Sequence, residues 1–127
     1  MCNMKNALNW FEIPVKNFDK AKSFYEEILQ TKMDTMTMEN MGLTMAFFPA
    51  DWTNGVGGGL AAGPGYEPSD KGSIIYLNGG EDLSVPLSRI EKAGGKVVLP
   101  KTSIGENGFM AHFIDIEGNR VALHSMS

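Results

Sequence analysis

Few side chains in this sequence are suited to catalysis, and two of them lie in segments near its two ends. The chain has two histidines, His112 and His124, and one cysteine, Cys2. Glu12 lies in an apolar segment near the start, and His124 lies in another near the end. A carboxyl group and an imidazole in one cavity can act as an acid–base pair. The alternatives are a solvent-exposed or backbone-capping Glu12 and a His124 at a frayed C-terminus.

Other polar and aromatic residues are weaker candidates for ligand contact. Glu106 lies in the polar segment 101–108, but loops are polar in any case. His112 lies between Ala111 and Phe113, where a structural histidine is the simpler interpretation. Trp52 lies in a turn segment and is either a stacking lid or a surface-packed ring. By strand alternation the Arg120 side chain could face a cavity, but the residue adjoins a turn, so we expect it at the surface.

A run of three glycines, Gly57–Gly59, has two interpretations. Glycine in a strand lets a ligand or another backbone approach closely, so the run could widen a cavity. It could equally mark a bulge or a bare stretch of backbone on which Trp10 or Trp52 packs. It is not a phosphate-binding loop, because no Lys-Ser/Thr follows it and no helix is predicted to begin there.

Composition limits the class of protein. The chain has 127 residues, 43% hydrophobic and 20% charged, as in one ordinary soluble domain. Its net charge is −4 and its Lys and Arg residues are scattered, so we expect neither nucleic acid nor a membrane as partner. No apolar run approaches the roughly 18 residues of a membrane span, and the start lacks a signal-peptide core. One cysteine permits no internal disulfide. We therefore predict a cytoplasmic protein.

The hydrophobic pattern predicts one order of elements twice. Residues 8–15 have strand character, and the next apolar residues, 21, 24, 25, 28 and 29, have helical spacing after possible caps at Asn17 and Asp19. Three strands follow at 33–38, 43–49 and 56–62. After a Gly/Pro-rich linker the second copy has strands at 73–78, 96–99, 109–114 and 119–125. Its one helix carries residues 83–93, capped by Asp82 or Ser84, and residues 100–108 are predicted as a loop.

The two copies also align residue by residue. Segment 54–60 falls on 119–125, Phe48 falls on Phe113 and Met45 on Met110, an offset of about 65 residues. Such a unit is too long for a solenoid repeat of ~20–50 residues. The sequence therefore predicts an α+β domain of two βαβββ modules, 8–63 and 72–126. A cleft between paired modules is a natural ligand site.

The sequence resembles the vicinal oxygen chelate superfamily, which includes glyoxalase I, extradiol dioxygenases and the bleomycin- and fosfomycin-resistance proteins. The resemblance rests on Phe11-Glu12-Ile13-Pro14-Val15 leading into Ala21-Lys22-Ser23-Phe24-Tyr25, on Glu91-Lys92-Ala93-Gly94-Gly95-Lys96-Val97, and on Phe113-Ile114-Asp115-Ile116-Glu117-Gly118-Asn119-Arg120-Val121. It implies that each module curls into a half-barrel and that paired modules enclose the site. It also implies a homodimer, because members of this size are commonly dimers.

The same resemblance implies four metal-ligand positions, which fall on Trp10, Gly57, Ile75 and Ala122. None of these side chains offers the carboxylate, imidazole or thiolate that a metal site needs. We therefore expect no metal and no other cofactor. Metal-dependent glyoxalase I activity is not expected, because that chemistry depends on a metal-bound enediolate.

Glu12 and His124 lie two residues beyond Trp10 and Ala122, so each pair shares one face of its strand. Three functions remain open. The first is a metal-independent protein that binds a small apolar or aromatic molecule in the inter-module cleft, contacted by Trp10, Trp52, Gly57, Gly59, Ile75, Glu106, His112 and Ala122. The second is a glyoxalase-related lyase or isomerase in which Glu12 and His124 transfer a proton next to a carbonyl. The third is an interaction module whose cleft is filled by its own side chains.

Overall fold

The computed structural model describes residues 6–51 and 53–127, which form two similar halves. The first half contains β1 (Trp10–Pro14), α1 (Phe18–Leu29), β2 (Asp34–Met38), the 3₁₀ turn η1 (Glu39–Met41), β3 (Leu43–Phe47) and β4 (Gly57–Ala62). The second contains β5 (Ile75–Asn78), α2 (Ser84–Leu87), α3 (Ile90–Ala93), β6 (Lys96–Ser103), η2 (Gly105–Asn107), β7 (Phe109–Ile114) and β8 (Arg120–Ser125). No helix of the described residues is long and apolar enough to cross a membrane.

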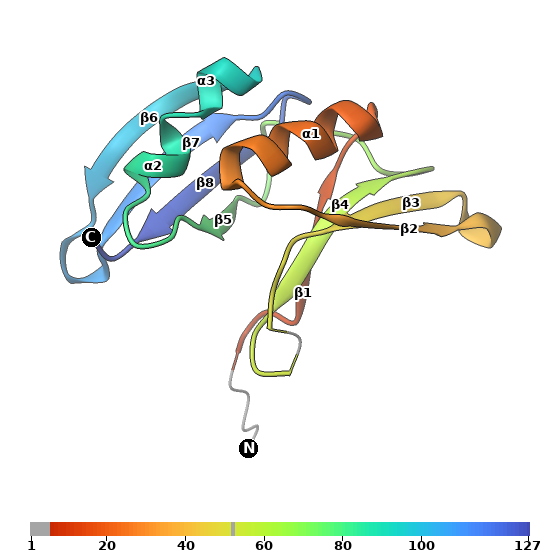
Figure 1. Ribbon diagram of the computed structural model, residues 1–127, viewed down its shortest axis with the longest axis horizontal. Helices are drawn as coiled ribbons and strands as arrows, with labels where there is room; N and C mark the ends of the chain where they lie inside the picture. Colours follow the sequence, from red (N-terminus) through yellow and green to blue (C-terminus); the bar gives the residue numbers. More distant parts are fainter. Residues whose placement is uncertain (1–5, 52) are drawn as a thin grey trace.

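Each half forms its own four-stranded mixed sheet. The strand orders are β1-β4-β3-β2 and β5-β8-β7-β6, so the second sheet repeats the first. The first strand of each half pairs in parallel with the last, and the other pairs are antiparallel. Figure 1 shows the two sheets diverging from the helices, with β1–β4 on the right and β5–β8 on the left. This arrangement confirms the predicted α+β fold of repeated βαβββ units.

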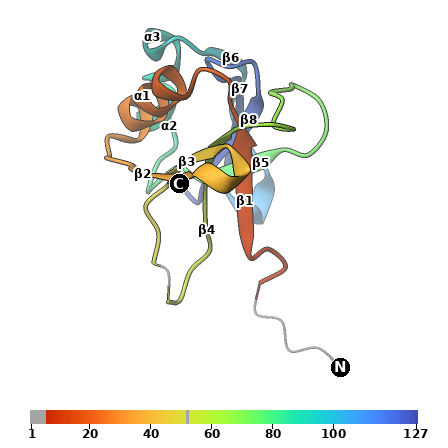
Figure 2. The ribbon, with the colours of Figure 1, turned by 90° about the vertical axis from the view of Figure 1, so that its right-hand side faces the viewer.

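The helices of both halves share one hydrophobic core. Phe24 and Ile28 of α1 are buried together with Leu60 of the first sheet and with Ile90 and Phe113 of the second half. Figure 2 shows the helices on one side of the molecule and the connection between the halves on the other. Because strand side chains alternate, each sheet has one face toward the helices and one turned away from them. We call the second kind the outer face.

The first helix forms as its sequence predicts. The side chain of Asn17 accepts a hydrogen bond from the Lys20 backbone N–H at 3.2 Å, which caps the N-terminus. Its apolar residues at helical spacing are buried, and Gln30 ends the helix in the left-handed region at φ 51°. The helix thus places its apolar stripe between the two sheets.

The second half departs from the sequence prediction in two places. The single predicted helix is two short helices, α2 and α3. The Ser88 hydroxyl bonds to the Val85 carbonyl at 2.7 Å and the Arg89 N–H bonds to Pro86 in a tight turn, which interrupts the helical pattern. The predicted loop 100–108 begins too early, because β6 continues through Pro100 to Ser103. Proline is tolerated there because β6 is an edge strand with register shifts.

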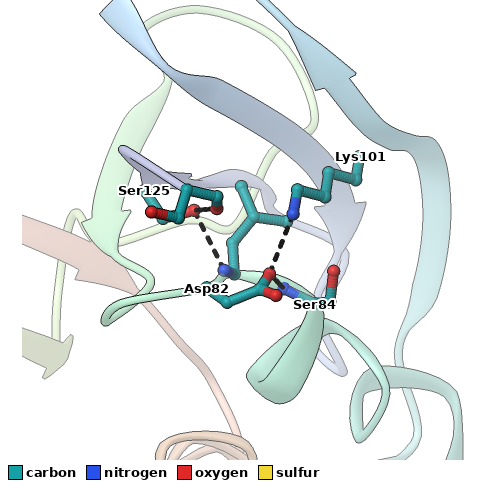
Figure 3. Close-up of polar contacts among 6 residues, drawn as sticks. Asp82, Ser84, Lys101 and Ser125 are labelled. Carbon is teal, nitrogen blue, oxygen red and sulfur yellow. Dashed lines mark hydrogen bonds and ion pairs between the residues drawn. The ribbon is translucent and has the colours of Figure 1, made fainter.

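The start of α2 is held by a polar cluster (Figure 3). Of the two candidate caps, Asp82 accepts the backbone N–H of Ser84 at 2.9 Å, and it also binds the Lys101 ammonium at 3.0 Å. The Ser84 N–H bond, with help from Lys101, lowers the pKa of Asp82 to about 2. Ser125 of β8 accepts the Leu83 N–H at 3.0 Å. Strands β6 and β8 of the second sheet thereby position the helical segment.

The glycine run in β4 accommodates an aromatic ring. Phe11 lies opposite Gly58 in the ladder, and a Cβ at Gly58 would lie 2.2 Å from the Phe11 ring. The ring that packs over bare backbone is thus Phe11, where the sequence suggested Trp10 or Trp52. A Cβ at Gly59 would lie 2.6 Å from the Ala46 carbonyl oxygen. Gly58 and Gly59 are therefore required for close packing against the neighbouring strands on the two sides of β4.

We expect Gly58→Ala to destabilise the protein, because the new methyl group displaces the Phe11 ring from the core. Overpacking of this kind costs about 1–3 kcal/mol. Urea unfolding followed by circular dichroism measures the difference. Gly65→Ala is a poor control, because Gly65 has a positive φ of 87° that alanine adopts only with strain. The control is instead Ala50→Gly, in the segment between β3 and β4. Equal stability of Gly58→Ala and the natural protein would contradict the Phe11 explanation.

Candidate functional site

The two halves enclose an apolar cleft of about 750 Å³ on the helix side of the sheets. The first half contributes Phe11, Phe48 and Gly58, and the second contributes Ile75 and Leu77 from β5. The end of α1, at Leu29 to Thr31, closes one side. Protein pockets that bind small molecules are typically of this size and mostly apolar. The cleft is therefore a candidate site for an apolar molecule.

The outer face of the first sheet carries Glu12. Its carboxylate accepts the Trp10 indole N–H at 3.3 Å and the Tyr66 hydroxyl at 2.9 Å. The hydrogen bond to Glu12 is the main cause that raises the pKa of Tyr66, followed by burial and the charge of Glu12. Trp10 also packs edge-on against Phe47, with ring centroids 5.8 Å apart. Glu12 is thus held in a defined position by two side chains.

The outer face of the second sheet carries a chain of three polar side chains. The Arg120 Nε–H donates to His112 Nδ1 at 3.0 Å, and His112 Nε2 lies 3.0 Å from the Tyr76 hydroxyl. Tyr76 and His112 lie on either side of Ala122, with which both are paired in the sheet. The small Ala122 side chain lets them meet. Burial lowers the pKa of His112, and the positive charge of Arg120 lowers it further.

His124 lies on the same outer face as these residues. Its Nε2 lies 2.6 Å from the Asn107 carbonyl oxygen. It is paired with Asn78 of β5 and with Met110 of β7. All three line a second pocket of about 790 Å³, together with Tyr76.

Within one chain the structure does not bring Glu12 and His124 together. Glu12 lines a small pocket with Lys71 and Arg120, whereas His124 lines the second pocket. Among the described residues no hydrogen bond joins the two side chains; Glu12 bonds to Trp10 and Tyr66, and His124 to Asn107. A shared proton-transfer site would therefore need a second copy of the chain.

The other predicted contact residues fall into separate groups. Gly57 and Ile75 line the apolar cleft. Trp10, Gly59, His112 and Ala122 lie on the outer faces, since their strand neighbours Phe11, Leu60, Ala111 and Leu123 belong to the shared core. Glu106 is exposed in η2. Trp52 lies outside the described residues.

The structure adds residues that the sequence did not select. Tyr76 lies opposite Ala122, whereas Ile75 lies opposite Val121 and packs against the shared core. The offset of about 65 residues therefore slips by one in β5, which put Ile75 where Tyr76 stands. Arg120 is half-buried on the outer face of the second sheet, where it is bonded to His112. The alternation of side chains along a strand could have placed both residues on the outer face, because Tyr76 precedes the buried Leu77 and Arg120 precedes the buried Val121.

The family metal does not fit the four inherited positions. Trp10 and Gly57 are partners in the β1–β4 ladder, but neither supplies a ligand atom for a divalent cation. Ile75 and Ala122 supply none, and Tyr76 beside them adds only a neutral phenol. Across residues 6–51 and 53–127, no three His, Cys, Asp or Glu side chains gather as metal ligands would.

The sequence model of the Glyoxalase/Bleomycin resistance protein/Dioxygenase superfamily matches residues 7–123. The chain belongs to this superfamily. Among curated proteins, none matches the sequence. The family membership agrees with the repeated βαβββ unit and with the three motifs from which the resemblance was inferred.

Solved structures of this superfamily share the fold. Glyoxalase I from Zea mays superposes with a TM-score of 0.68 at 20% identity, covering 93% of this chain and 45% of the maize chain. The trypanothione-dependent glyoxalase I of Leishmania major has a TM-score of 0.68 at 19% identity, covering 96% and 88%. The fosfomycin resistance protein FosX from Listeria monocytogenes has a TM-score of 0.64 at 16% identity, covering 98% and 94%. This chain thus spans less than half of the maize enzyme. At these identities the similarity establishes the fold alone.

We expect Arg120→Met to raise the pKa of His112, because the substitution removes the positive charge that disfavours the imidazolium. Titration of the histidine ring signals by NMR measures the shift. His124 serves as the internal control, since it has a different partner, the Asn107 carbonyl. An unchanged His112 titration would show that burial alone sets its pKa.

Proposed function

We propose that this protein binds a small apolar or aromatic molecule in the cleft between its two halves, without a metal. The observation that carries the proposal is the 750 Å³ cleft lined by Phe11, Phe48 and Leu77. Its walls come from both modules, so the site depends on their packing. Few polar groups line the cleft, so it does not need a charged ligand to satisfy them. The drug-sequestering branch of the family offers a parallel for such binding.

Side chains at the cleft mouth provide a direct test. Ile74 lines the cleft and is 38% exposed, whereas Val98 on β6 is also 38% exposed but lies outside the cleft lining. A carboxylate at position 74 must be desolvated when an apolar ligand binds, and an equal carboxylate at position 98 must not. The two positions form a matched pair for the same substitution.

We expect Ile74→Glu to weaken binding of the neutral fluorescent probe N-phenyl-1-naphthylamine by about tenfold, equivalent to about 1.4 kcal/mol. We expect Val98→Glu to leave the dissociation constant unchanged. Fluorescence titration at constant ionic strength measures both. If the natural protein does not bind the probe, or if both variants weaken it equally, the cleft is not the apolar site.

We further infer a homodimer in which the outer faces of two copies meet. Met36 and Tyr76, which lie on the outer faces of the two sheets, are 41% and 48% exposed, and a second copy packed on these faces would cover them. The family offers precedent for dimers. The alternative function, proton transfer by Glu12 and His124 next to a carbonyl, requires this arrangement, because the two residues line different pockets of one chain.

Native mass spectrometry of protein purified from its own host tests both inferences. We expect a metal-free dimer with an organic adduct, whose mass identifies the ligand. A monomer would leave Glu12 and His124 in separate pockets and would exclude them as a catalytic pair. A dimer with one metal ion per site would overturn the metal-independent proposal.

A further inference from the structure

The second pocket, on the outer face of the second sheet, brings His124 together with Tyr76 and Asn78, two residues that also line the cleft. It is lined by Tyr76, Asn78, Ile104, Met110, His124 and Met126, among others. We propose that it binds a carboxamide group attached to a small apolar body. The second pocket adjoins the cleft, and the carboxamide would be bound by polar groups that an apolar ligand of the cleft does not need.

The hydrogen-bond direction at Tyr76 is fixed by chemistry. A guanidinium has only donors, so His112 Nδ1 must accept from Arg120 and carries no hydrogen. A neutral imidazole has one N–H, which is therefore on Nε2 and donates to the Tyr76 oxygen. The lowered pKa of His112 favours this neutral form. The Tyr76 hydroxyl hydrogen is thus directed away from His112, and within residues 6–51 and 53–127 the acceptor it meets is the weak Met110 sulfur at 3.5 Å.

Asn78 presents its amino group for a similar reason. Its side-chain oxygen accepts the Gly80 backbone N–H at 2.9 Å, so the oxygen end of the amide is assigned. The Nδ2 group then carries two hydrogens that can donate to a ligand. Asn78 is two residues beyond Tyr76 on β5, so both side chains project from the same face. The pocket therefore has two donors on one strand.

His124 supplies an acceptor beside them. The Asn107 carbonyl can only accept, so His124 Nε2 carries a hydrogen and donates it; the tautomer with this hydrogen has its lone pair on Nδ1. His124 is the ladder partner of Asn78 in the parallel β5–β8 pair, and both residues line the second pocket. Two donors next to one acceptor complement a carboxamide, whose oxygen accepts and whose N–H donates. Ile104, Met110 and Met126 provide apolar contact for the body of the ligand.

Benzamide is the probe, and the binding is followed by NMR titration of the full-length protein. We expect saturable shifts at Tyr76, Asn78 and His124 with a dissociation constant on the order of 1 mM, as for other fragments of this size. N,N-dimethylbenzamide, which lacks the N–H, should bind about fivefold more weakly. Nitrogen shifts of both histidine rings should report the Nε2–H form.

Two variants and one control locate the site. Tyr76→Phe keeps the ring but loses the donor, and Asn78→Asp keeps the Gly80 bond but replaces the amino group with an acceptor. Each should weaken benzamide by about fivefold or more. Tyr66→Phe, which removes a hydroxyl bonded to Glu12 on the other sheet, should not. No saturable binding of benzamide, equal binding of the dimethyl compound, or an equal effect of Tyr66→Phe overturns the proposal. The naphthylamine test of the cleft is distinguishable from this one, because it compares Ile74→Glu with Val98→Glu and neither residue lines the second pocket.

Discussion

The carboxylate of Asp115 joins the two halves of this protein. It is 4% exposed and accepts the hydroxyl hydrogen of the fully buried Tyr25 at 2.7 Å. Its other oxygen accepts two backbone N–H groups of the turn that follows β7, from Glu117 and Asn119. Burial, together with the Asp115 charge, raises the pKa of Tyr25. Because a buried carboxylate is stable only when its lone pairs are satisfied, the turn and α1 must keep this relative position.

The same turn also reaches the rest of the first half. Asn119 donates to the Pro14 carbonyl at 2.8 Å and accepts the Ser69 N–H at 2.9 Å. The Glu117 carboxylate accepts the backbone N–H groups of Lys16 and Asn17, just before α1. One tight turn of the second half thus positions β1, the start of α1 and the linker. The shared helical core and the apolar cleft both follow from this junction.

Packing through the helices determines which faces remain open. The helix-side faces of both sheets are buried in one core, so the outer faces of a single chain do not enclose a site together. The polar residues Glu12, Tyr76, Asn78 and His124 consequently lie on open faces, where their orientation is set by hydrogen bonds to neighbours. Arg120, His112 and Tyr76 show how such a chain of bonds can fix the direction of a single hydroxyl hydrogen.

Much of the fold could be predicted from the sequence because the information is local. Strand alternation, the helical spacing of Ala21, Phe24, Tyr25 and Ile28, and the repeat at about 65 residues defined the βαβββ modules. The sequence also determined the chemistry of the inherited metal positions, since side-chain type alone decides whether a ligand atom exists. The break between α2 and α3 and the extension of β6 were missed because they depend on Ser88 and on edge-strand tolerance of Pro100.

Only the tertiary structure decided which residues meet. The slip that puts Tyr76, and not Ile75, opposite Ala122 results from strand pairing between segments far apart in the chain. The separation of Glu12 from His124 follows from packing the modules through their helices, which no periodicity encodes. The sequence thus determined the elements and their chemistry, because these depend on near neighbours. The structure decided the sites, because these depend on long-range contacts such as that of Tyr25 with Asp115.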